Sequence, residues 1–293
     1  MKFGIIFLLI TLSSFIGHTV STVTVVADPT ETIHPSEKAH PLVDQHAEHY
    51  QQASLPSLKQ ISFSTSNSIA PYFFADKPQG VQYDLLLAAL ELNDIAIKEL
   101  VHAPNLRAQR LVNTKIIDCM VNTPDNVEGM FYTQSLIEYQ NSVFYLTKNH
   151  LQVNNVQDLK PITILGFQNA KNYLGDEFEA LATASSSYSE ISNQKSQVVM
   201  LFNGHTQSIV LERRIFEYYR HQLRDKLNTS LPVTEVALFA PAERKIACHD
   251  KHTAAIVDLA ISTLKQSYRY QEILDLAEKN SYQPAQYYNQ LTR

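Results

Sequence analysis

The feature that most constrains the fold is an alternation of strand-like and helix-like segments that begins at residue 59. Residues 59–66 alternate apolar and polar side chains and predict a strand, and residues 83–93 carry apolar side chains at helical spacing. A second strand (95–101), a short helix (105–115) and a third strand (116–121) follow. This order predicts a mostly parallel sheet with helices on its faces, and therefore an α/β fold.

A second series of the same kind follows an extended, β-rich stretch at residues 142–149. Its pattern predicts strands at 162–167, 206–212, 232–240 and 245–249, and helices at 169–182, 194–204, 213–223 and 252–280. Asn169 is expected to cap the first of these helices, and Gly204 is expected to end the second.

The N-terminal part of the chain has a different character. Residues 1–27 combine a positive start, an apolar run too short to span a bilayer comfortably, and small residues at a cleavage site, which predicts a secretory signal peptide. An uncleaved anchor is the alternative. Residues 28–58 contain few large apolar side chains and predict a flexible extension. The extension also holds His34, His40, His46 and His49, which suit a solvated tail better than a metal site. The predicted location is the periplasm.

Composition narrows the class of function. The net charge of −5 gives no basic surface for nucleic acid, and the 7 glycines form no phosphate-binding pattern, so no cofactor and no metal are expected. No later apolar run reaches 18 residues, so a soluble monomer is expected after signal cleavage. Cys119 and Cys248 both lie in strand-like stretches. They could pair in an oxidising compartment or remain buried thiols, since neighbouring strands seldom place Cβ atoms for a bridge.

Five segments, taken in order, resemble one family. They are SNSIAPYFF (66–74), GVQYDLLLAAL (80–90), TPDNVEGMFYTQSL (123–136), VQDLKPITILGFQNAKNYLG (156–175) and LFNGHTQSIVLE (201–212). Together they are similar to the bacterial extracellular solute-binding proteins of family 3. The resemblance implies an α/β, two-lobed type II periplasmic binding protein fold with two hinge-crossing strands. Lobe 1 would comprise residues 59–145 plus 240–293, and lobe 2 residues 146–239, with a ligand in the cleft between them.

One position departs from this family pattern. Where relatives that carry amino acids have an arginine that clamps the ligand's α-carboxylate, this chain has the uncharged Asn126. The acidic partner of the α-ammonium would be Glu212, in place of the usual aspartate. The resemblance therefore implies a small polar ligand other than a standard α-amino acid, with a cationic or hydroxyl group favoured by Glu212.

The resemblance also places other residues near the ligand, and each has a simpler structural alternative. These residues are Tyr72, Phe73, Arg107, Asn122, Thr123, Gln168 and Asn169. The two aromatics could be core residues, and Arg107 could form a surface salt bridge. Gln168 and Asn169 could offer helix-terminal N–H groups to an anion or simply cap the helix. Glu212 could instead be an exposed acid paired with Arg213 or Arg214.

Three functions are compatible with these patterns. The first is capture of a small molecule for an ABC permease, and the second is signalling of ligand occupancy to a membrane sensor. The third, an enzyme on the same fold, is disfavoured because no nucleophile-elbow or zinc-protease motif occurs and His205 suits a solvated surface position. We therefore expect a binding protein and no catalytic residues.

Overall fold

The structure is a computed structural model that describes residues 60–65, 69–74, 76–123 and 127–280. The predicted signal peptide, the predicted extension with its histidines and the predicted site residue Asn126 lie outside these described residues. Within them, strands and helices alternate as expected, and the predicted α/β class is confirmed.

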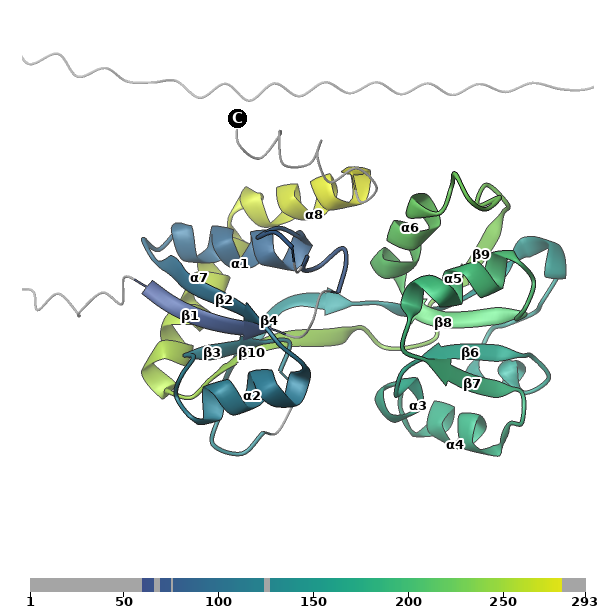
Figure 1. Cartoon of the computed structure of the whole chain (residues 1–293), viewed down its shortest axis with the longest axis horizontal. Helices are drawn as coiled ribbons and strands as arrows, with labels where there is room; N and C mark the ends of the chain where they lie inside the picture. Colours follow the sequence, from purple (N-terminus) through teal and green to yellow (C-terminus); the bar gives the residue numbers. More distant parts are fainter. Residues whose placement is uncertain (1–59, 66–68, 75, 124–126, 281–293) are drawn as a thin grey trace, which may run out of the picture. The chain divides into compact units, whose positions relative to one another are not determined.

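The first sheet has the strand order β2-β1-β3-β10-β4. Its strands are β1 (Gln60–Thr65), β2 (Ala96–His102), β3 (Cys119–Val121), β4 (Phe131–Tyr139) and β10 (Ala242–Cys248). Strands β1, β2 and β3 are parallel, and β10 runs antiparallel to both β3 and β4. Helices α1 (Val81–Glu91) and α7 (Lys251–Gln266) cover one face, and α2 (Asn105–Asn113) covers the other (Figure 1). The last helix, α8 (Tyr268–Asn280), packs against α1 and α7. We call this part lobe one.

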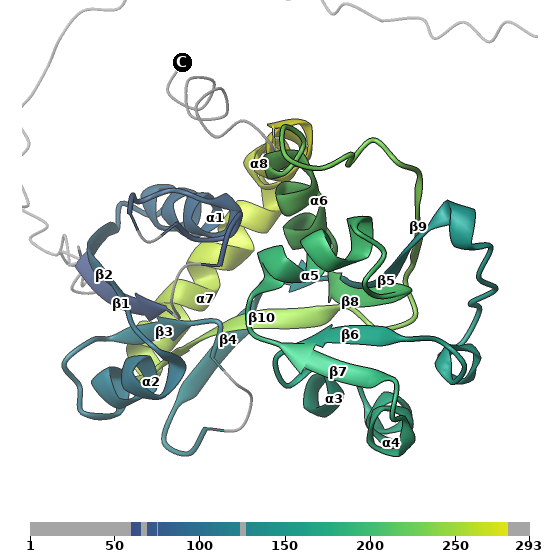
Figure 2. The same ribbon diagram turned by 45° about the vertical axis from the view of Figure 1, so that its right-hand side comes forward.

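The second sheet has the order β7-β6-β8-β5-β9. Its strands are β5 (Asn141–Leu146), β6 (Ile164–Phe167), β7 (Tyr188–Ile191), β8 (Ser208–Glu212) and β9 (Val233–Val236). Helices α5 (Gln194–Phe202) and α6 (Arg213–Gln222) lie on one face, and α3 (Ala170–Tyr173) and α4 (Asp176–Ala184) on the other (Figure 2). Two 3₁₀ turns, Thr147–Asn149 and Val156–Leu159, precede β6. We call this part lobe two.

The chain passes between the sheets twice. It leaves the first sheet at Gln140, between β4 and β5, and returns between β9 and β10. Strand β5 pairs with β8 and β9, so the first passage falls at residue 140 and not near residue 145 as the sequence suggested. The second passage, at residues 237–241, includes the expected position near residue 240.

Strand β1 shows how the sheet is buried on both faces. Its side chains alternate between apolar and polar, yet every residue after Gln60 is buried. The Ser64 hydroxyl donates to the carbonyl of Ala108 in α2, at 3.2 Å. The Ser62 hydroxyl donates to the Asp118 carboxylate at 2.6 Å. The polar face of β1 is therefore satisfied by hydrogen bonds beneath α2 and at the strand's start, and not by solvent.

Several predicted elements differ in length. The helix expected over 169–182 is broken into α3 and α4 at Gly175, whose φ is 93°. This left-handed conformation suits glycine and interrupts the helix. The strand expected over 232–240 is regular only in β9. Gly204, with φ of 73°, follows the end of α5 as predicted.

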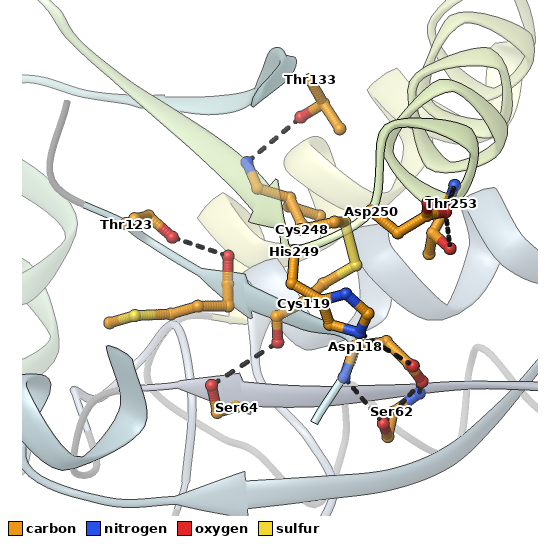
Figure 3. Close-up of a disulfide and its surroundings, with 12 residues drawn as sticks. Ser62, Ser64, Asp118, Cys119, Thr123, Thr133, Cys248, His249, Asp250 and Thr253 are labelled. Carbon is orange, nitrogen blue, oxygen red and sulfur yellow. Dashed lines mark hydrogen bonds and ion pairs between the residues drawn. A yellow bond between two sulfur atoms is a disulfide. The ribbon is translucent and has the colours of Figure 1, made fainter. Parts of the chain in front are cut away.

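Cys119 and Cys248 form a disulfide that joins β3 to β10 (Figure 3). The two residues face each other directly in the antiparallel register, with Cα atoms 4.0 Å apart, and both are fully buried. The alternative of two free thiols is therefore wrong. The sequence did not reveal that the chain returns to place β10 beside β3.

Candidate functional site

Tyr72 lies in the loop between β1 and α1 and is fully buried. Its ring stacks on Tyr139, the last residue of β4, with centroids 4.0 Å apart. Gly80, with φ of 132°, lies against the backbone of Tyr72. A Cβ atom at residue 80 would overlap the carbonyl oxygen of Tyr72. Because Gly80 has no side chain, the loop can hold the Tyr72 ring in contact with Tyr139, next to the first passage between the lobes.

A hydrogen-bonded triangle surrounds the Tyr139 hydroxyl. That hydroxyl donates to Oε1 of Gln82 in α1, at 2.8 Å, and Gln82 donates in turn to Oδ1 of Asn122, at 2.7 Å. Asn122 follows β3 in a left-handed conformation (φ 60°) and donates to the Tyr139 oxygen at 3.4 Å. The Arg244 guanidinium lies 4.4 Å from the centroid of the Tyr139 ring. Burial raises the pKa of Tyr139, so its hydroxyl stays protonated near neutral pH.

Glu212, the last residue of β8, approaches this cluster from lobe two. One carboxylate oxygen, Oε2, accepts a hydrogen bond of 2.9 Å from the backbone N–H of Ile215 and so caps α6. The other, Oε1, is buried and has no hydrogen-bond partner within the part of the chain that the structure describes. The exposed-acid alternative for Glu212 is therefore wrong, since only 3% of the residue is exposed.

Two neighbours share this buried environment. Burial raises the pKa of the Glu212 carboxyl, while the Ile215 N–H, the Tyr72 hydroxyl and the Arg214 charge oppose that rise. The Tyr72 hydroxyl and Arg214 Nε, like Glu212 Oε1, make no hydrogen bond of good geometry to any described residue. An acid, a phenol and a guanidinium thus meet where the two lobes join, each with unused hydrogen-bonding capacity.

Glu190 fills the position where the sequence suggested an anion. It lies on β7, and its carboxylate accepts hydrogen bonds from the backbone N–H groups of Asn169 (2.7 Å) and Lys171 (3.1 Å) and from the Tyr188 hydroxyl (2.6 Å). Desolvation would raise its pKa, but these hydrogen bonds and the Lys171 charge together lower it. Glu190 is therefore ionised, and it satisfies the N–H groups at the start of α3 from within the protein.

Contacts between the lobes surround the cluster. Phe74 of lobe one meets Tyr218 of α6 edge to face, with centroids 5.9 Å apart. Arg213 and Arg214 of α6 form ion pairs with Glu278 of α8, at 3.3 and 3.4 Å. These contacts join α6 to lobe one on the side where Tyr72 and Glu212 meet.

The structure brings together three of the predicted site residues, Tyr72, Asn122 and Glu212. Phe73 is a core residue packed edge to face on His102, and the Thr123 hydroxyl donates to the carbonyl of Met120.

The remaining predicted residues lie elsewhere. Arg107 is exposed on α2, and Gln168 and Asn169 are exposed at the turn after β6. Asn169 does not cap α3 with its side chain, because its backbone is left-handed there (φ 65°).

Four residues of the cluster and its surroundings were missed by sequence reasoning. Tyr139, Gln82, Arg214 and Glu190 make the contacts described above. Gln82 lies within the GVQYDL segment and could have been found from that motif. The other three depend on long-range packing that no local pattern reports.

A serine, an aspartate and a histidine also meet at the other end of the first sheet (Figure 3). Ser62 donates to Asp118 at 2.6 Å, and His249 Nε2 lies 3.8 Å from the same carboxylate. The aspartate stands between the other two, whereas an activated serine needs the histidine at its hydroxyl. This group therefore joins β1, β3 and the end of β10 and has no arrangement for nucleophilic catalysis.

Two features are absent from the described ranges. No cluster of three or more His, Cys, Asp or Glu side chains with metal-binding geometry occurs in residues 60–280 outside the gaps given above. Among the same residues, no helix has both the length and the apolarity needed to cross a bilayer.

Comparison with known proteins gives structural matches alone. No family model matches the chain, and no curated protein matches its sequence. The ligand-binding core of GluR0 in complex with L-glutamate matches with a TM-score of 0.59 at 15% identity, covering 75% of this chain and 98% of that one. A histidine kinase sensor domain with similarity to periplasmic binding proteins matches with a TM-score of 0.58 at 15% identity, over 74% and 95% of the two chains.

A third match is ArtJ, the arginine-, lysine- and histidine-binding protein of Geobacillus stearothermophilus. Its TM-score is 0.54 at 20% identity, covering 74% of this chain and 94% of that one. Identities this low establish a shared fold and say nothing about the ligand.

Proposed function

From the premise that this chain has the type II periplasmic binding protein fold, we propose that it is a secreted protein that binds a small polar molecule between its two lobes. The ligand would contact Tyr72 and Glu212 and would then be presented to an ABC importer in the periplasm. Proteins with this fold that are described as ABC-transporter substrate-binding proteins support the importer role.

The observation that carries the proposal is the buried Oε1 atom of Glu212, which makes no hydrogen bond of good geometry to the residues that the structure describes. A buried carboxylate oxygen without a hydrogen bond is costly, and a ligand that donates to it recovers that cost on binding. The Tyr72 hydroxyl beside it also makes no hydrogen bond of good geometry to a described residue, so it is a second polar group that a ligand could bind. An ammonium or hydroxyl group is therefore the part of the ligand expected at Glu212.

A ligand carboxylate is disfavoured on two counts. The position that carries arginine in amino-acid carriers is Asn126 here. The N–H groups at the start of α3 already bind the Glu190 carboxylate. Common α-amino acids are therefore expected to bind weakly, and simple amines or polyols are favoured.

Signalling is the second candidate function. It is supported by the match to a histidine kinase sensor domain, which comes from a different class of protein than the transport proteins. A permease and ATPase gene beside the coding gene would favour import, and a sensor kinase gene in that place would favour signalling. Catalysis is a third and weaker candidate, since the Ser62–Asp118–His249 group lacks the necessary order.

The test is a thermal-shift screen of the chain without residues 1–27 against amines, polyols, sugars, organic acids and α-amino acids. We expect an amine or polyol to raise the Tm, since binding to the folded state stabilises it. Glu212→Gln should abolish that shift, while Glu99→Gln, which changes an exposed acid on β2, should preserve it. Equal stabilisation of wild type and Glu212→Gln by several α-amino acids would refute the proposed site.

A further inference from the structure

A cavity of about 250 Å³ lies beside the two passages between the lobes. Lobe two contributes Arg213 and Arg214 from the start of α6, and lobe one contributes Lys265 at the end of α7. Gln140 and Pro241 line it from the two passages themselves. It is therefore built from both lobes and both crossings, apart from the rings of Tyr72 and Tyr139.

The lining of this cavity has an excess of positive charge. Arg213, Arg214 and Lys265 face a single carboxylate in the lining, that of Glu138. Outside the lining, both arginines share Glu278, through ion pairs of 3.3 and 3.4 Å. The Glu278 side chain is 53% exposed, so solvent screens much of its attraction. Two guanidinium groups that share one exposed carboxylate retain capacity to bind a further anion.

Arg214 is the more buried of the two arginines, with a side chain 13% exposed against 44% for Arg213. Its guanidinium also interacts with the Tyr72 hydroxyl and the Glu212 carboxylate. The Lys265 ammonium lies 5.9 Å from the Tyr270 ring, a contact that leaves its three N–H donors available. A guanidinium presents its N–H groups in a fork that matches carboxylate and phosphate oxygens.

We propose that this cavity binds a small anion bearing phosphate or carboxylate groups, at a site separate from Glu212. The volume of about 250 Å³ suits an inorganic phosphate or a small di- or tricarboxylate. Because the lining comes from both lobes, a bound anion stabilises the arrangement of the lobes that forms the cavity. Arg214 contributes to both places, so the anion and the Glu212 ligand are coupled through one side chain.

Two probes distinguish the sources of such an anion. The protein without residues 1–27 is titrated with inorganic phosphate in one arm and citrate in the other, at constant ionic strength adjusted with chloride. Saturable binding by calorimetry, with a matching rise in Tm, is expected in one or both arms. Binding of phosphate alone assigns a phosphate ligand, and binding of citrate alone assigns a carboxylate.

Variants then locate the site. Arg213→Gln combined with Lys265→Gln should weaken binding at least tenfold, because charged hydrogen-bond donors are lost. The matched control is Lys98→Gln with Arg110→Gln, which removes the same charge from exposed positions on β2 and α2 and should leave affinity within twofold. Glu278→Gln should tighten binding by freeing both guanidinium groups.

The absence of saturable binding in both arms would overturn the proposal. Equal weakening by the control pair would also overturn it, since net charge and not the cavity would then set the affinity. The anion titrations contain no amine or polyol, so their result can fail or succeed separately from the amine screen.

Discussion

The carboxylate of Glu190 accepts a 2.7 Å hydrogen bond from the backbone N–H of Asn169. A negatively charged group of the protein thus occupies a helix start that would otherwise attract an anionic part of a ligand. By the sequence resemblance described above, Asn126 stands where the family pattern has an arginine. Both changes act in the same direction, away from ligands with a carboxylate.

We expect that restoring both features creates amino-acid binding. Asn126→Arg supplies the missing guanidinium, and Glu190→Ala frees the N–H groups of Asn169 and Lys171. The double variant should bind at least one α-amino acid at least tenfold more tightly than wild type, by calorimetry, because charged hydrogen bonds contribute about 1.5–3 kcal/mol. The single variants serve as controls. Unchanged affinity in the double variant would mean that neither residue determines ligand class.

The pH dependence of stability should identify Glu212. Burial raises its pKa above the ordinary value of 4.5, so the folded state holds this proton more tightly than the unfolded chain does. Stability therefore falls as the pH rises from 4.5 through the raised folded pKa, and is constant above it. Urea unfolding between pH 4 and 8 should show this fall in wild type and its loss in Glu212→Gln. Parallel profiles for the two proteins would contradict the assignment.

Gly80 should be indispensable to the placement of Tyr72. An alanine at residue 80 meets the Tyr72 carbonyl, in addition to the strain of a positive φ. Gly80→Ala should lower the free energy of unfolding by more than about 2 kcal/mol and abolish ligand binding. Gly204→Ala is the matched control, since Gly204 also has a positive φ but a Cβ there meets nothing within 4 Å. If Gly80→Ala lowers the free energy of unfolding no more than Gly204→Ala does, the loop that holds Tyr72 can shift to make room for a side chain at residue 80.

The disulfide should contribute substantially to stability. Cys119→Ala with Cys248→Ala should lower the free energy of unfolding by about 2–4 kcal/mol, measured with urea. A reductant should lower the free energy of unfolding of the wild type toward that of the variant. It should do so only once the protein has unfolded, because both sulfurs are buried in the folded state. The variant itself should not respond to the reductant, and a wild type that unfolds identically with and without reductant would argue against the bond.

Local patterns predicted the fold where they extend over whole elements. The α/β order was readable because the segments of β1 and α1 have the composition of a strand and of a buried helix, and because Gly204 closely follows α5. Strand β7 was missed because YSEI is short and only partly buried. The helix over 169–182 was predicted too long because composition does not report the left-handed backbone at Gly175.

The residues of the candidate site also fall into those that local motifs predicted and those that they did not. Tyr72 and Glu212 were found because they lie in recognisable motifs, and the structure places them together. Tyr139 and Glu190 were not found, since they act through partners distant in sequence or through a turn that no motif marks. Arg214 was named only as a surface ion-pair partner of Glu212, and its approach to Tyr72 could not be read from the sequence. The disulfide was left open for a related reason, because only the antiparallel return of β10 brings Cys248 opposite Cys119.

The disulfide spans 129 residues of sequence, and every strand of the second sheet lies within that span. Lobe two is thus an insertion enclosed in a covalent ring whose closure lies inside lobe one. A single proteolytic nick in a surface loop of lobe two would leave both fragments attached under oxidising conditions. The same closure would let new termini be opened in such a loop, by circular permutation, without detaching β10 from β3.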